Sequence, residues 1–385
     1  MNVPQEEIHG RWRRVREEMA DAGVDVLVTG ASAQMEFRGA LRYLANYVLP
    51  VFEEYLVLPL TGAVALFTHD AAGADYAARY GATDEVRIVP GHEYNSDPGR
   101  CVAEYVRSFG PGRVGLAGQA GLSANFYLSL LRHLGGVAPV DFTPRMNRVR
   151  RVQSPLEIRL SEAAVRLNEE TFRHYLQFVG PGRRELDAIA AASRFAAEAG
   201  AEELYWMAAS GPLPRLAYLA DARQRGHVWC GGDYHTIVLE HSAEGGYFGE
   251  TTHLISLGDP DPRYVRAFAA VGEAQRAAAA RIRPGATVGE LADAAEAVLI
   301  ERGYARPRGA GEPPAAIGHG QGADVWEFPR IVSGDATPIE PGMRFNIHPL
   351  AVLEDGARIT SCDCHIATQD GSRRLSTLPY EIAVV

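Results

Sequence analysis

Hydrophobic residues in the first part of the chain recur first at helical spacing and then in short strand-like runs. Ile8, Trp12, Val15 and Met19 lie at helical intervals, which predicts a helix over residues 6–22 that Gly23 ends. We expect further helices at 36–45, 74–80 and 100–109, and strands at 24–28, 55–60, 63–67, 86–89 and 114–117. Alternating helices and strands of this length predict an α/β domain that ends near residue 145.

A helix start marks the entry to the second part of the chain. Ser154 is a suitable N-cap and Pro155 a suitable first helical residue. We therefore predict two domains, residues 1–148 and residues 149–385.

The second domain contains a weak internal repeat with an offset of about a hundred residues. Helices at 157–177 and 185–199 are joined by a Pro-Gly turn, and helices at 262–282 and 288–302 are joined by another. Each pair then leads into strands. Two such α-α-β units are expected to pack as halves around a shared groove, which is a natural place for a ligand.

Composition excludes several classes of protein. The 385 residues include 46% hydrophobic and 22% charged residues, as in ordinary globular proteins. The net charge of −10 argues against nucleic acid and anionic membranes as partners. Four cysteines are too few for a disulfide scaffold, so we expect a reducing, cytoplasmic environment.

The segment 317–330, IGHGQGADVWEFPR, surrounds His319 with three glycines, which let backbone or ligand approach the imidazole closely. This string resembles the histidine segment of the creatinase/prolidase/methionine-aminopeptidase superfamily. Residues 37–47 and 148–157 resemble that family's N-terminal domain and its link to the catalytic domain. The resemblance implies a mixed α/β (α+β) fold: a creatinase-like N-terminal domain and a C-terminal pita-bread domain with pseudo-twofold halves. It also implies a homodimer.

The resemblance implies five metal-ligand positions. Only some of them carry a residue in this chain that can bind a metal. His319 keeps the histidine, and Glu250 replaces the second aspartate. The first aspartate falls on Val238 or Leu239, neither of which can bind a metal. A second histidine that is frequent in metallopeptidases is replaced by Trp326.

The two glutamate positions are also altered. His348 takes the place of the first, on a strand whose alternation turns Asn346 and His348 away from the apolar face. Cys362 or Asp363 takes the place of the second. Because Cys362 and Cys364 lie on the strand face opposite Asp363, we interpret them as buried, inert thiols rather than a zinc clip.

Two divalent cations need several carboxylates to offset their charge, and this set provides too few. We therefore predict a metal-independent, creatinase-like hydrolase that acts on a C–N bond of a small molecule without being a peptidase. His319 and His348 would transfer protons and Glu250 would orient one imidazole. The predicted substrate-binding residues are Trp326, Tyr218, Arg215, Asn346 and Asp363.

Three alternatives remain. The first is a metal-dependent Xaa-Pro dipeptidase or aminopeptidase, with one manganese, zinc or iron ion held by Glu250, His319, His348 and Asp363. The second is an inactive pseudo-peptidase that only binds. The third is a lyase or another specialised small-molecule enzyme on the same fold.

Overall fold

The computed structural model describes residues 3–32, 37–48, 52–217, 226–305, 313 and 315–385. The chain divides into two compact units, Met1–Arg150 and Arg151–Val385. The domain boundary expected from the sequence, between residues 148 and 149, lies inside helix α7 (Thr143–Arg151). No helix within the described ranges is both long and apolar enough to cross a membrane.

The first unit is built on one mixed six-stranded sheet with the order β4-β3-β2-β1-β5-β6. β1 pairs antiparallel with β2 and parallel with β5, so the sheet combines hairpin and crossover connections. Its elements are α1 (Gln5–Ala22), β1 (Val26–Ala31), α2 (Gly39–Ala45), β2 (Glu54–Pro59), β3 (Ala65–Thr68), α3 (Ala71–Tyr80), β4 (Glu85–Ile88), α4 (Gly91–Tyr94), α5 (Gly99–Ser108), β5 (Val114–Leu116), the short 3₁₀ helix Gln119–Gly121, α6 (Ala124–His133) and β6 (Val140–Asp141). The predicted α/β domain is confirmed, and Gly23 ends α1 in the left-handed conformation with φ 62°.

The second unit starts with α8 (Pro155–Leu176), whose first turn is capped as its sequence predicts. The Ser154 hydroxyl accepts a hydrogen bond from the Glu157 amide (3.2 Å), and the Glu157 carboxylate accepts one from the Ser154 amide (2.8 Å). This reciprocal capping box satisfies two amides that have no partner inside the helix.

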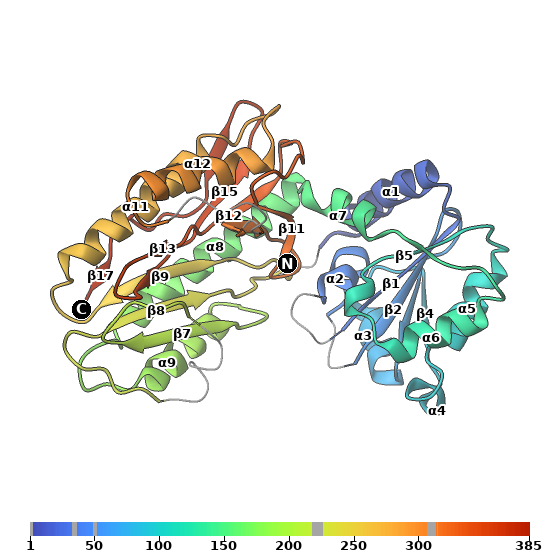
Figure 1. Ribbon diagram of the computed structural model, residues 1–385. Helices are drawn as coiled ribbons and strands as arrows, with labels where there is room; N and C mark the ends of the chain where they lie inside the picture. The colour runs from blue at the N-terminus through green and yellow to red at the C-terminus, as the bar shows by residue number, and fades with distance from the viewer. Residues whose placement is uncertain (1–2, 33–36, 49–51, 218–225, 306–312, 314) are drawn as a thin grey trace. The chain divides into compact units, whose positions relative to one another are not determined.

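The internal repeat predicted from the sequence is present as two α-α-β halves (Figure 1). The first half comprises α8, α9 (Glu185–Glu198), β7 (Trp206–Gly211), β8 (Tyr234–Leu239) and β9 (Thr251–Ser256). The second comprises α11 (Pro262–Ala279), α12 (Val288–Glu301), β10 (Gly318–Gly320), β11 (Glu327–Arg330), β12 (Arg344–Ile347), β13 (Ala351–Val352), β14 (Arg358–Ile359), β15 (Asp363–Ala367), β16 (Ser372–Arg374) and β17 (Ala383–Val384). In both halves the turn between the helices uses a glycine with positive φ, 80° at Gly182 and 86° at Gly285.

The strands of the second unit form two main sheets, with the orders β17-β9-β8-β7 and β11-β10-β12-β15-β16. β17 crosses between the halves and pairs in parallel with β9. A backbone hydrogen bond from the Cys362 amide to the Thr252 oxygen (3.2 Å) also joins the second half to β9. The ends of β9, β10 and β12 are thereby held next to one another.

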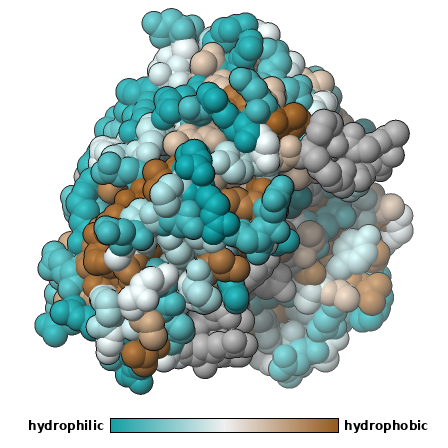
Figure 2. Space-filling view, turned by 60° about the vertical axis from the view of Figure 1, so that its left-hand side comes forward, coloured by the Kyte–Doolittle hydropathy of each residue, from teal (hydrophilic) through white to brown (hydrophobic). Residues whose placement is uncertain are grey.

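The largest apolar core of the second unit lies where α11 and α12 cover the strands. It includes Val271, Leu291, Phe345 and Ile347, all less than 1% exposed. The outer surface is mixed: Figure 2 shows hydrophobic side chains in small groups among hydrophilic ones on one face. The helices therefore fix the strand backbones, and the polar face of β12 is left to build a site.

Gly249 is the point where α8 meets the segment that leads into β9. A Cβ at residue 249 would overlap the main-chain oxygen of Ala164 and lie 2.7 Å from the Asn168 amide nitrogen. We expect Gly249→Ala to lower the free energy of unfolding by about 1–3 kcal/mol, because α8 must move away. Gly231→Ala is the matched control, since Gly231 is exposed with no atom within 4 Å of its Cβ position. Equal urea midpoints for the two variants would contradict this packing account.

Candidate metal centre

His319 lies at the middle of β10, between two strands that approach unusually closely. β10 pairs with β11 on one side and β12 on the other. A Cβ on Gly318 would overlap the main-chain oxygen of Asn346, and one on Gly320 would lie 2.5 Å from that of Phe328. The glycines flanking His319 thus allow close backbone approach, as the sequence indicated.

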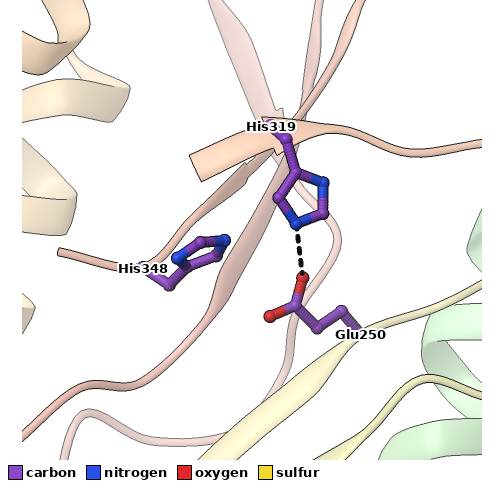
Figure 3. Close-up of side chains that lie close together, drawn as sticks. All are labelled: Glu250, His319 and His348. Carbon is purple, nitrogen blue, oxygen red and sulfur yellow. Dashed lines mark ion pairs between the residues drawn. The ribbon is translucent and has the colours of Figure 1, made fainter. Parts of the chain in front are cut away.

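The tautomer of His319 follows from its contacts. Its Nδ1 lies 2.8 Å from the Gly320 oxygen, and a carbonyl only accepts, so Nδ1 carries the proton. Nε2 lies 3.6 Å from Oε2 of Glu250 (Figure 3). In the neutral imidazole, Nε2 then presents a lone pair to the carboxylate.

Glu250 immediately precedes β9 and is 5% exposed. The Asn346 amide donates to its Oε2 (2.9 Å), and the Thr252 hydroxyl donates to its Oε1 (3.1 Å). These two bonds fix the carboxylate plane. Asn346 therefore orients the Glu250 carboxylate. It also lies on the face of β12 that strand alternation predicted for the site.

His348 follows β12 on the same face as Asn346, and Figure 3 shows its ring beside His319 and Glu250. The ring centroids of the two histidines are 5.1 Å apart. One ligand atom from each of Glu250, His319 and His348 lies within 4.8 Å of the others. The three residues that we predicted as catalytic are thus brought together. Donor atoms around one ion are separated by roughly 3–4 Å, so a small contraction would close the triad on a cation.

Burial and charge set the ionisation of this group. Burial lowers the pKa of His319 to about 4, although the Glu250 carboxylate opposes that shift. Burial opposes ionisation of Glu250, but His348, His319 and the Asn346 amide together hold its pKa below the usual value. At neutral pH the site therefore pairs a carboxylate with a neutral imidazole at His319.

Trp326 and Arg330 border the triad on the β11 side. The Trp326 ring lies 4.8 Å from that of His319. The Arg330 guanidinium lies 4.2 Å over the Trp326 ring, and residue 330 pairs directly with residue 319 across the β10–β11 ladder. Trp326 is partly buried and Arg330 is exposed, so the triad is flanked by an aromatic face and a cation.

The other predicted substrate-binding residues lie elsewhere. Asp363 is on the opposite face of its strand, where its carboxylate accepts from Arg374 (2.8 Å) and Tyr380 and contacts His365 (3.0 Å). It is therefore not part of the triad. Arg215 is exposed in the segment after β7, and Tyr218 lies outside the described residues.

A buried polar chain beside the triad was not predicted. Arg344, 2% exposed, donates to Gln321 Oε1 (2.7 Å) and to the Phe248 oxygen (2.6 Å). The Gln321 amide donates to Glu240 (3.3 Å). This chain ties β12 to the segment before Glu250. The predicted polar face of β12, which includes Arg344, was the sequence signal that could have indicated it.

Comparison with known proteins shows the family to which the chain belongs. Residues 159–368 match metallopeptidase family M24, and residues 11–152 match the creatinase/prolidase N-terminal domain. The chain belongs to metallopeptidase family M24. The superfamily and pita-bread architecture expected from the histidine segment are thereby confirmed.

Similar proteins carry dipeptidase names. The chain is 33% identical over 256 residues to a protein named probable dipeptidase PepE of Mycobacterium bovis, a match that covers 65% of each chain. It is 29% identical over 141 residues to an Xaa-Pro dipeptidase of Lactobacillus helveticus, covering 36% of this chain and 37% of that one. The crystal structure of dipeptidase PepE from Mycobacterium ulcerans covers 100% of both chains at 25% identity, with a TM-score of 0.81.

These findings contradict our prediction of a metal-independent enzyme that is not a peptidase. The family is one of metallopeptidases, and its relatives are named dipeptidases. The error lay in the charge argument. A set with too few carboxylates for two cations can still hold one cation, and Glu250, His319 and His348 offer one carboxylate and two imidazoles for it.

Acid should destabilise the metal-free protein through His319. Its pKa is about 4 in the folded chain and 6.5 in an unstructured peptide, so below pH 6.5 the unfolded chain binds a proton that the folded chain does not. Stability is therefore present above pH 6.5 and is lost as pH falls toward 4. We expect the free energy of unfolding of His319→Gln to decrease less steeply as pH falls than that of the wild type, by at most about 1.4 kcal/mol per pH unit. Urea unfolding in the presence of a chelator measures this slope. His174→Gln, at a partly buried helix position, is the control; an unchanged slope in His319→Gln would refute the assignment.

Proposed function

We propose that this chain is a metal-dependent dipeptidase that holds a single divalent cation between Glu250, His319 and His348. The observation that supports this most is the pairing of two hydrogen-bond acceptors, Nε2 of His319 and Oε2 of Glu250, 3.6 Å apart. Two facing acceptors repel unless a cation lies between them. The family to which the chain belongs makes a divalent metal the expected cation.

The donor set suits one ion of manganese, zinc or iron. Two imidazoles and one carboxylate are ligands that these metals accept. When bound, such a cation polarises a peptide carbonyl and lowers the pKa of a water molecule. Around it, Asn346 and Thr252 hold the Glu250 carboxylate in place. Asn346 Oδ1 has no hydrogen-bond partner among the described residues and can accept one from the substrate's amino group.

Dipeptide specificity needs groups that recognise both ends of a short substrate. Arg330 provides an exposed cation beside the site and matches the free carboxylate of a dipeptide. Trp326 provides a flat aromatic face next to His319, which suits packing against a proline ring. Xaa-Pro dipeptides are therefore the proposed substrates, in line with the name of the Lactobacillus relative. Binding roles for Arg215 and Tyr218, and assembly as a homodimer, remain predictions.

Metal removal tests the proposal directly. Chelator-treated protein should lose hydrolysis of Xaa-Pro dipeptides, and one equivalent of manganese, zinc or iron should restore it, because the triad can hold one ion. His348→Ala should reduce metal affinity by roughly tenfold or more and should not recover full activity at one equivalent. Full turnover in metal-free protein would refute the proposal, as would metal-loaded protein that binds dipeptides without cleaving them.

Arg330→Ala tests recognition of the substrate carboxylate. We expect KM for Xaa-Pro dipeptides to rise by roughly tenfold or more, the loss of a charge-assisted bond of about 1.5–3 kcal/mol. The same variant should hardly change KM for Xaa-Pro amides, which lack the carboxylate. Arg283→Ala, at an exposed position in the same unit, is the matched control. Equal changes for dipeptide and amide would show that Arg330 does not contact the carboxylate.

A further inference from the structure

Cys362 and Cys364 lie on the site-facing side of their strand, opposite Asp363 and His365. The ladder between β12 and β15 pairs Asn346 with Cys364 and Ile347 with Asp363. Directly paired residues share a face of the sheet, so Cys364 lies on the same face as Asn346. By strand alternation, Cys362 is expected on that same face, two residues before Cys364. The two thiols are 4.0 Å apart.

Cys362 lies near the triad on the side of Glu250. The Cys362 side chain is among the groups that lower the pKa of the Glu250 carboxyl. The Cys362 backbone amide donates to the oxygen of Thr252, the residue that orients that carboxylate. Cys362 thus lies beside Thr252 and close to Glu250. It is outside the three-residue group whose ligand atoms lie within 4.8 Å of one another.

An unpartnered buried atom points to a ligand in the same place. Asn346 is fully buried, and its Oδ1 has no hydrogen-bond partner within the described part of the chain, although its amide nitrogen binds Glu250. A buried acceptor without a partner destabilises the folded chain. A bound group beside Glu250 would relieve that destabilisation.

We propose that Cys362 is the fourth protein ligand of the metal centre and makes it selective for zinc over manganese. This inference rests on the proposed single-ion site. A thiolate is a soft ligand that favours zinc, whereas carboxylate and water favour manganese. On binding, the Cys362 S–H bond breaks, the sulfur binds the cation, and the proton leaves to solvent. One thiolate and one carboxylate then offset both charges of the ion, and two imidazoles complete the set.

Cys364 is the natural control because its sulfur is engaged otherwise. Its Sγ lies 3.5 Å from the main-chain oxygen of Glu250 and 3.9 Å from the Arg344 guanidinium. Arg344 belongs to the buried polar chain beside the triad, and the Glu250 oxygen belongs to the main chain that leads into β9. Replacing Cys364 therefore perturbs the same region without removing the proposed ligand.

The test uses the full chain with the other two cysteines, Cys101 and Cys230, replaced by serine. Cobalt-loaded protein should show a near-ultraviolet thiolate-to-cobalt charge-transfer band. Cys362→Ser should abolish this band and weaken zinc binding by roughly tenfold or more, measured by competition with a chromophoric chelator. Cys364→Ser should keep the band, and Cys362→Asp should shift the zinc-to-manganese affinity ratio toward manganese by roughly tenfold or more.

The outcomes separate the two proposals. A wild-type chain that binds cobalt without the band, or a Cys362→Ser variant with unchanged zinc affinity, would overturn the cysteine ligand and leave the single-ion site standing. Loss of the band in Cys364→Ser but not in Cys362→Ser would also overturn it. A wild-type chain that binds neither cobalt nor zinc would overturn the single-ion site and the cysteine ligand together. Circular dichroism of each variant checks that the fold is retained.

Discussion

The interaction on which the site depends is the approach of the Glu250 carboxylate to the Nε2 atom of His319. The two residues come from different halves of the repeat, Glu250 from the start of β9 and His319 from β10. Each is fixed independently: Asn346 and Thr252 hold the carboxylate, and the Gly320 oxygen holds the imidazole. Two acceptors are thereby kept in opposition by the fold, which is the arrangement that a cation can stabilise.

Close strand packing makes this opposition possible. Glycines at 318 and 320 let β10 lie against β12 and β11 without side chains between the backbones. Gly249 does the same between α8 and the segment that carries Glu250. Small residues on both sides of the site therefore bring larger, ligating side chains into one place. Burial then keeps His319 neutral at physiological pH, and a neutral imidazole is the form that binds metals.

Much of this could be predicted from the sequence because local signals agreed with the fold. The capping residues Ser154 and Glu157 fixed the start of α8, and alternation along β12 placed Asn346 and His348 on one face. Strand alternation was not sufficient to place Asp363. Both faces of β15 are buried, so alternation separates Asp363 from Cys362 but does not tell which of them faces the site. The answer depends on Arg374 and Tyr380, which follow Asp363 by 11 and 17 residues and bind it on the other face.

The prediction of a metal-independent enzyme was wrong because it relied on the number of carboxylates alone. Carboxylates offset cationic charge, so their number limits how many ions a site holds. It does not determine whether a site holds any, because neutral imidazoles bind metals without adding charge. Relative to the two-ion site that the resemblance implies, the chain lacks an acidic residue at Val238 or Leu239 and at His348, yet it has Glu250 and an imidazole at His348. Fewer acidic residues provide less negative charge and fewer donor oxygens, which is consistent with the proposed single ion.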